Sequence, residues 1–173
     1  MEPLFECTTV QNREVLRMAA ARLMRTKLIV HAVILITLAL GFLAFVLIRR
    51  LEHVYFFSTA FSMACIALAI WRFENVPQKF SRKTYEDQVK LYGEPAVTDV
   101  CVYESQLRVE NRLQRRVKQY DWQDCVKIME TKELFLILTR QKTVVVLDKS
   151  GFHHGEPAEF PVFFQSIKHG QKK

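Results

Sequence analysis

The sequence predicts an α+β membrane protein in which a hairpin of two transmembrane helices is joined to a cytoplasmic antiparallel β-sheet or barrel. Residues 28–48 and 55–71 are two uncharged, strongly apolar segments separated by six residues. From residue 96 onward, apolar residues recur at every second position in short segments bounded by turn residues, which is typical of antiparallel strands. The last apolar segment, residues 159–169, has helical spacing and is expected to cap the sheet.

Residues 28–48 predict the first membrane span. As a helix this segment is about 31 Å long, close to the thickness of the hydrocarbon core of a bilayer. A soluble helix of this length would carry a polar stripe, and this one has none. A signal peptide is a poorer alternative, because the run begins after residue 27 and ends at Arg49 and Arg50 rather than at small residues. Residues 55–71 extend about 26 Å as a helix, which is short but sufficient for a second span.

The distribution of Lys and Arg predicts the orientation of the hairpin. Basic residues flank both spans on one side, and the connecting loop, residues 49–54, has only Arg49 and Arg50. The flanking residues are Arg13, Arg17, Arg22, Arg25 and Lys27 before the first span, and Arg72, Lys79, Arg82, Lys83 and Lys90 after the second. Because positive charge is retained on the cytoplasmic side, we expect both termini in the cytoplasm and the loop outside.

The remaining segments complete the expected domain organisation. Residues 1–10 are expected to contain a strand, and pairing of residues 4–9 with the sheet would make the hairpin an insertion within one domain. Residues 11–27 predict an amphipathic helix that continues into the first span. Residues 72–93 predict a juxtamembrane helix that starts near Pro77 and ends at Gly93.

Residues 94–173 predict the β-domain with its C-terminal helix. The expected strands cover residues 96–104, 108–113, 115–122, 125–130, 134–139 and 143–148. Residues 134–138 are apolar at consecutive positions, so this strand is expected to be buried on both faces. Trp122 is expected to anchor the core rather than to form an exposed stacking surface.

Four stretches carry a resemblance to a known family. They are "FECTTVQNREV" at residues 5–15, "GEPAVTDVCVYESQLRVEN" at 93–111, "YDWQDCVKIMETKELFLIL" at 120–138 and "TVVVLDKSGF" at 143–152. In this order they resemble the YcxB-like family of small bacterial proteins with two spans and a cytoplasmic β-domain. The resemblance implies a pleckstrin-homology-like (PH-like) barrel in a bacterial plasma membrane. It implies no activity, and Cys125, Leu147 and Asp148 depart from the family pattern.

The candidate binding residues are basic and surround one turn between two strands. They are Arg108, Arg112, Arg115, Arg116 and Lys118. If they converge on one rim of the domain, they would suit anionic lipid headgroups or carboxylates. The alternative is an ordinary solvated hairpin.

Small residues in the second span are the candidate helix-packing residues. Ser58 and Ser62, with Ala60 and Ala64, are each four residues apart and would allow a close approach to the first span. Whether they also form an intermolecular face is left open by the sequence.

No residue pattern indicates catalysis, a cofactor or a metal. Neither a nucleophile with a base nor a pair of carboxylates can be assembled. His153 and His154 are adjacent, so on an extended segment they point to opposite sides. The four cysteines are scattered and are expected to be reduced and structural. The net charge of +7 is concentrated beside the spans, which favours a lipid surface over nucleic acid.

These features predict a non-enzymatic membrane protein whose cytoplasmic domain binds a protein partner or an anionic lipid headgroup. The alternative is a structural subunit of a membrane complex or of a homo-oligomer, with the hairpin packed against other membrane helices. An enzyme is the least expected class.

Overall fold

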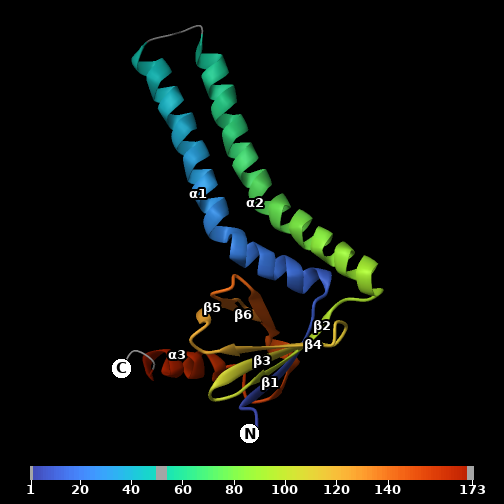
Figure 1. Ribbon diagram of the computed structural model, residues 1–173. Helices are drawn as coiled ribbons and strands as arrows, with labels where there is room; N and C mark the ends of the chain where they lie inside the picture. Colours follow the sequence, from blue (N-terminus) through green and yellow to red (C-terminus); the bar gives the residue numbers. More distant parts are fainter. Residues whose placement is uncertain (1, 50–53, 171–173) are drawn as a thin grey trace. The chain divides into compact units, whose positions relative to one another are not determined.

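The computed structural model describes residues 2–49 and 54–170 of the 173-residue chain. The fold is α+β, with two long apolar helices, antiparallel β-structure and a C-terminal helix (Figure 1). The chain forms two compact units, Met1–Arg22 with Ser81–Lys173, and Leu23–Phe80. The first unit contains the strands, and the second contains the two apolar helical segments.

The larger sheet places the N-terminal strand between strands from the other end of the chain. Its order is β4–β3–β2–β1–β8, built from β1 (Phe5–Val10), β2 (Val97–Val102), β3 (Gln106–Asn111), β4 (Arg116–Asp121) and β8 (Phe152–His154). β1 pairs antiparallel with β2 along its whole length and with β8 through Glu6 and Cys7. The predicted pairing of the N-terminal residues with the sheet is confirmed. The hairpin is therefore inserted within one folded unit, between β1 and β2.

The smaller sheet has the order β5–β6–β7. It is formed by β5 (Cys125–Glu130), β6 (Leu134–Thr139) and β7 (Val144–Asp148). Five of the six residues of β6 are buried, as its consecutive apolar residues predicted. The backbone N–H of Asp148 in β7 donates to Oγ1 of Thr9 in β1, 3.0 Å away, which joins the two sheets at one corner.

The sheets do not close into a barrel, so the barrel alternative is wrong. The chain turns sharply between β4 and β5, where Asp124 N donates to Asp121 O and Cys125 N donates to Trp122 O. This turn carries Trp122 into the core and leaves β4 and β5 as the ends of two separate sheets.

The core lies between the sheets and under the C-terminal helix α3 (Phe160–Gly170), which follows the short 3₁₀ helix η2 (Lys149–Gly151) and β8. Trp122 is 1% exposed, and its indole N–H donates to Tyr103 O at 3.0 Å. Its ring lies edge-on to Phe163 and Phe164, with centroids 5.8 Å apart in both cases. The predicted roles of Trp122 as a core anchor and of the last helix as a cap are confirmed.

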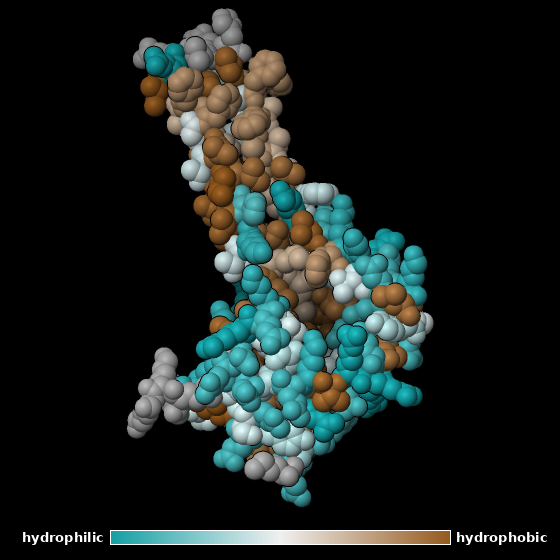
Figure 2. Space-filling view, in the orientation of Figure 1, coloured by the Kyte–Doolittle hydropathy of each residue, from teal (hydrophilic) through white to brown (hydrophobic). Residues whose placement is uncertain are grey.

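The second unit contains the apolar parts of α1 (Arg13–Ile48) and α2 (Tyr55–Tyr92), both long and apolar enough to cross a membrane. Hydrophobic residues cover these segments on the face shown in Figure 2. Ser62 Oγ donates to Ala39 O at 3.4 Å, and Phe42 contacts Phe61 edge-on with centroids 5.6 Å apart. These contacts hold the two segments together as a hairpin.

The helix boundaries differ from the prediction at one place. α1 runs without interruption from the amphipathic segment into the apolar one, as expected. The expected new helix at Pro77 is wrong, because α2 is continuous and Pro77 lies inside it. Proline removes one backbone donor, to the carbonyl four residues earlier, and a long helix tolerates this loss when its other bonds remain. Most of the predicted external loop, residues 50–53, lies outside the described residues.

Candidate functional site

The inner face of the larger sheet changes from apolar to polar along its strands. Strand register aligns three rows across β1, β2, β3 and β4. The first row is Phe5, Val102, Leu107 and Tyr120, the second is Cys7, Val100, Val109 and Lys118, and the third is Thr9, Thr98, Asn111 and Arg116. Residues that face a core are normally apolar, so polar residues on this face mark a place where the core gives way to a different kind of site.

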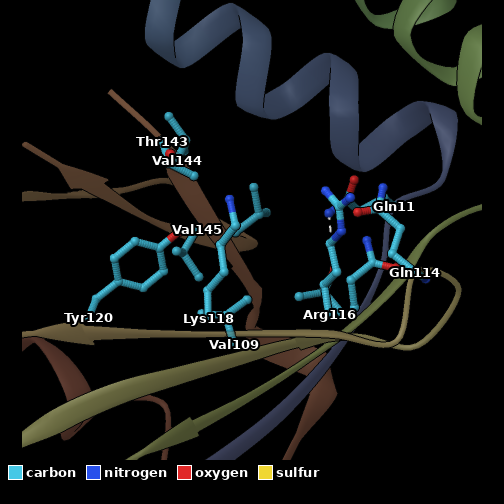
Figure 3. Close-up of a pocket in the computed structure, with 12 residues that line it drawn as sticks. Gln11, Val109, Gln114, Arg116, Lys118, Tyr120, Thr143, Val144 and Val145 are labelled. Carbon is cyan, nitrogen blue, oxygen red and sulfur yellow. Dashed lines mark hydrogen bonds between the residues drawn. The ribbon is translucent and has the colours of Figure 1, made fainter. Parts of the chain in front are cut away.

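A pocket lies where the polar end of this face meets β7. Arg116, Lys118 and Tyr120 rise into it from β4, and Val144–Val146 border it from β7 (Figure 3). Its cavity volume of about 160 Å³ is well above the space that one water molecule needs and admits a small polar group such as a phosphate. The pocket lies wholly within the first unit.

Both charged residues that line this pocket are basic. Arg116 and Lys118 are its charged lining residues, and no carboxylate lines it within the described part of the chain. Neither side chain makes an ion pair with any residue that the structure describes, although both belong to a core-facing set. Both residues are exposed, and β7, which borders the pocket, pairs with β6 in the smaller sheet rather than covering β4. Two free cations on a concave surface suit an anionic ligand.

The other basic residues predicted to converge here do not line the pocket. Arg108 lies on the outer face of β3 and pairs with Glu110 at 3.3 Å. Arg112 makes a bidentate ion pair with Asp99. Arg115 forms part of the β3–β4 turn. The predicted group of five is thus divided, and only Arg116 and Lys118 share one site.

Asp99 binds both Arg112 and Thr8 on the outer face of the larger sheet. Burial alone would raise the pKa of its carboxyl group, but hydrogen bonds from Arg112 and Thr8 outweigh burial and hold this pKa below its ordinary value. The Thr8 hydroxyl donates to Asp99 at 2.7 Å. Arg112 is therefore committed to fixing the β3–β4 turn against β2 and is not available to a ligand.

Two left-handed residues stand at the edges of the pocket. Arg115 has a φ of 48° and directly precedes Arg116, while Lys142 has a φ of 60° and directly precedes Thr143. Residues other than glycine and asparagine adopt this conformation at a cost in free energy. Both turns that border the pocket therefore carry a basic residue where Gly or Asn would be favoured for conformation.

The β7 strand adds backbone groups to the pocket. Thr139 N donates to Thr143 O and Lys149 N donates to Glu133 O, both at 2.9 Å, so residues 143, 145, 147 and 149 turn their backbone groups toward β6. In an antiparallel ladder the alternate residues turn theirs away. Asp148 does so, donating to Thr9, and Val144 and Val146 therefore direct their N–H and C=O groups away from β6 beside the pocket.

Two glutamines complete the pocket lining and were not predicted. Gln11 precedes α1, and Gln114 lies in the β3–β4 turn (Figure 3). Gln11 donates through Nε2 to Thr98 Oγ1 at 3.1 Å, and Gln114 donates through Nε2 to Tyr92 Oη at 2.9 Å. Gln11 is distant from Arg116 along the chain, so local sequence does not reveal its place in the pocket, whereas Gln114 lies only two residues before Arg116 and could have been included.

The predicted helix-packing residues fall on two faces of α2. Ser58 is fully buried and Ser62 bonds to α1, so these two belong to the seam of the hairpin. Ala60 and Ala64 are exposed on another face.

The cysteines and histidines assemble no reactive site among the described residues. Burial raises the pKa of Cys7 and of Cys125 to about 11, which keeps both thiols neutral. All four cysteines are free. Within residues 2–49 and 54–170, no group of three His, Cys, Asp or Glu side chains is placed to hold a metal ion.

Comparisons with known proteins give no family for this chain. No protein-family model matches it, and no curated protein is similar in sequence. The pocket and the two apolar helices are therefore the features of the molecule that bear on its function.

Proposed function

We propose that this protein is a membrane-anchored, non-enzymatic binding module whose pocket accepts the headgroup of an anionic lipid. Residues 28–48 and 55–71 would cross the plasma membrane of a bacterium, with both termini and the β-domain in the cytoplasm. The apolar surface of the two helices and the basic residues on their flanks support this placement.

One observation carries the proposal. Arg116 and Lys118 lie next to each other on the core-facing side of β4, unpaired and with no acidic residue among the described pocket lining. Both side chains are exposed and line the same concave surface, where two like charges favour an anionic ligand. Each basic residue near an anionic membrane surface contributes on the order of 1 kcal/mol to binding.

The strand order supports a PH-like domain of the YcxB-like kind. Four antiparallel strands, β1 to β4, are followed by three more, β5 to β7, and then by the capping helix α3. In this proposal the membrane hairpin is an insertion between the first two strands. The fold by itself assigns no ligand, and the chemistry of the pocket residues indicates an anionic one.

Native mass spectrometry of the full chain in detergent tests this function. We expect phosphatidylglycerol to bind more tightly than phosphatidylcholine. The double variant Arg116→Glu with Lys118→Glu should weaken phosphatidylglycerol binding by at least about tenfold, because it removes two attractive charges and adds two repulsive ones.

A matched control separates the pocket from the general effect of charge. Lys127→Glu with Lys132→Glu changes the net charge by the same amount at exposed positions that do not line the pocket. This control should keep most of the affinity for phosphatidylglycerol. Equal losses in both double variants would contradict a specific role for the pocket.

A further inference from the structure

The two glutamines of the pocket hold neutral hydroxyl groups instead of pointing at a ligand. Gln11 Nε2 donates to Thr98 Oγ1, and Gln114 Nε2 donates to Tyr92 Oη. Gln114 and Tyr92 are both exposed, so water competes for their hydrogen bond and its net contribution is small. The amide of Gln114 is therefore available at low cost to a better acceptor.

These hydrogen bonds also tie the ends of α1 and α2 to the pocket. Asn12, next to Gln11, caps the start of α1 by accepting from Val15 N at 2.8 Å. Gln88 in α2 donates through Nε2 to Gln11 Oε1 at 2.9 Å. Tyr92 is the last residue of α2. All of these residues belong to the first unit, and both helices continue from it into the apolar segments.

A phosphate-type oxyanion matches the donors of this pocket. Its oxygens can accept from the guanidinium of Arg116 and from the ammonium of Lys118, and at least one oxygen remains for an amide N–H. Hydrogen bonds to a charged acceptor are about twice as strong as those between neutral groups. A bound phosphate group would therefore compete successfully with the Tyr92 hydroxyl for the amide of Gln114.

We propose that a phosphate group bound by Arg116 and Lys118 draws the amide of Gln114 away from Tyr92 and so releases the C-terminal end of α2. The inference rests on the proposed anion site and adds the class of anion and a consequence of its binding. Because α2 also contains the second apolar segment, binding in the pocket would loosen one end of the helix whose other part is proposed to cross the membrane.

Hydrogen–deuterium exchange of the full chain tests this release. The protein is placed in phosphatidylcholine nanodiscs and titrated with inorganic phosphate, with chloride at equal ionic strength as the control. Amides of residues 86–92 should exchange roughly twofold to tenfold faster with phosphate, which is the range for loss of one neutral hydrogen bond. A second arm replaces free phosphate by phosphatidic acid in the nanodisc, which shows whether a lipid-borne phosphate has the same effect.

Variants of the contact separate coupling from binding. Tyr92→Phe removes only the hydroxyl, so exchange in residues 86–92 should already be fast without phosphate and should not rise further. Arg116→Ala with Lys118→Ala should keep the slow exchange of the wild type and lose the response to phosphate.

Calorimetric titration of the same nanodiscs with phosphate distinguishes failure of the release mechanism from failure of the anion site. Binding of phosphate with unchanged exchange in residues 86–92 would overturn the release mechanism and leave the anion site intact. Absence of free-phosphate binding, together with no change of exchange in the phosphatidic acid nanodiscs, would overturn both the mechanism and the proposed function.

Discussion

The hydroxyl oxygen of Thr9 accepts a hydrogen bond from the backbone N–H of Asp148, 3.0 Å away, although the two residues are 139 positions apart in the sequence. Thr9 is fully buried, and next to it Cys7 Sγ donates to Asp148 O at 3.3 Å. These contacts join the larger sheet to the smaller one. They also define the corner from which β7 diverges, and the pocket occupies the space that this divergence leaves.

Thr9→Val should destabilise the β-domain. The valine has nearly the same shape but leaves the partly buried N–H of Asp148 without its acceptor, which costs on the order of 1 kcal/mol. Urea unfolding of the full chain in detergent, followed by tryptophan fluorescence, measures the effect. Thr26→Val, at an exposed position of α1, is the control and should change the midpoint little. Similar midpoints for the two variants would show that the corner bond is unimportant.

Gly151→Ala should also destabilise the same corner. A Cβ at this position would lie 2.1 Å from the backbone oxygen of Thr8, and the backbone of Thr8 is held by the pairing of β1 with β2. Overpacking of this kind costs about 1–3 kcal/mol. The urea midpoint should fall well below that of Gly41→Ala, since a Cβ at Gly41 meets no atom within 4 Å. An unchanged midpoint for Gly151→Ala would mean that η2 is not held against β1.

The Asp99 carboxylate should make stability depend on pH in the acid range. Its pKa is lower in the folded protein than the ordinary value of 3.8, so its contribution is complete above pH 4 and is lost as the pH falls through the folded pKa. Asp99→Asn should lower stability at neutral pH by about 1 kcal/mol and reduce the acid dependence. Unfolding midpoints measured from neutral pH to pH 3 test this, and an acid dependence identical to the wild type would refute it.

The buried thiols should be unreactive in the native protein. Because burial raises the pKa of Cys7 and Cys125 to about 11, thiolate is scarce at neutral pH and both sulfur atoms are shielded. Cys101 is half-buried, and its pKa is raised by burial and by Glu6. We expect an alkylating reagent to label Cys101 first, with Cys7 and Cys125 labelled only after unfolding, as read by mass spectrometry of tryptic peptides. Early labelling of Cys7 would contradict its place in the core.

Periodicity predicted most of the strands and both long helices because these elements depend on local patterns. Alternation identified most of the segments that became β2 to β7, a short continuous apolar run identified β6, and the two long apolar runs identified the hairpin. β8 was missed because three residues carry too little pattern. The break expected at Pro77 was wrong because intact neighbouring bonds let α2 continue through it.

The candidate site was only partly visible in the sequence. Alternation with the buried Tyr120 places Arg116 and Lys118 on the core side of β4, and alternation with the buried Leu107 places Arg108 on the opposite face of β3, a signal that could have separated them. The pairing of Arg112 with Asp99 depends on the register of β2 and β3, which local sequence does not contain. Gln11 and β7 reach the pocket through contacts between distant parts of the chain.

The most direct test of the anion pocket observes its side chains individually. Nuclear magnetic resonance of the full chain in phosphatidylcholine nanodiscs can follow the side-chain N–H signals of arginine while glycerol phosphate, a soluble headgroup analogue, is added. The pocket account predicts a saturable shift of the Arg116 signal, with the signals of Arg108 and Arg112 unmoved because their carboxylate partners already occupy them. Equal small shifts of all three signals, or no shift of Arg116, would contradict it.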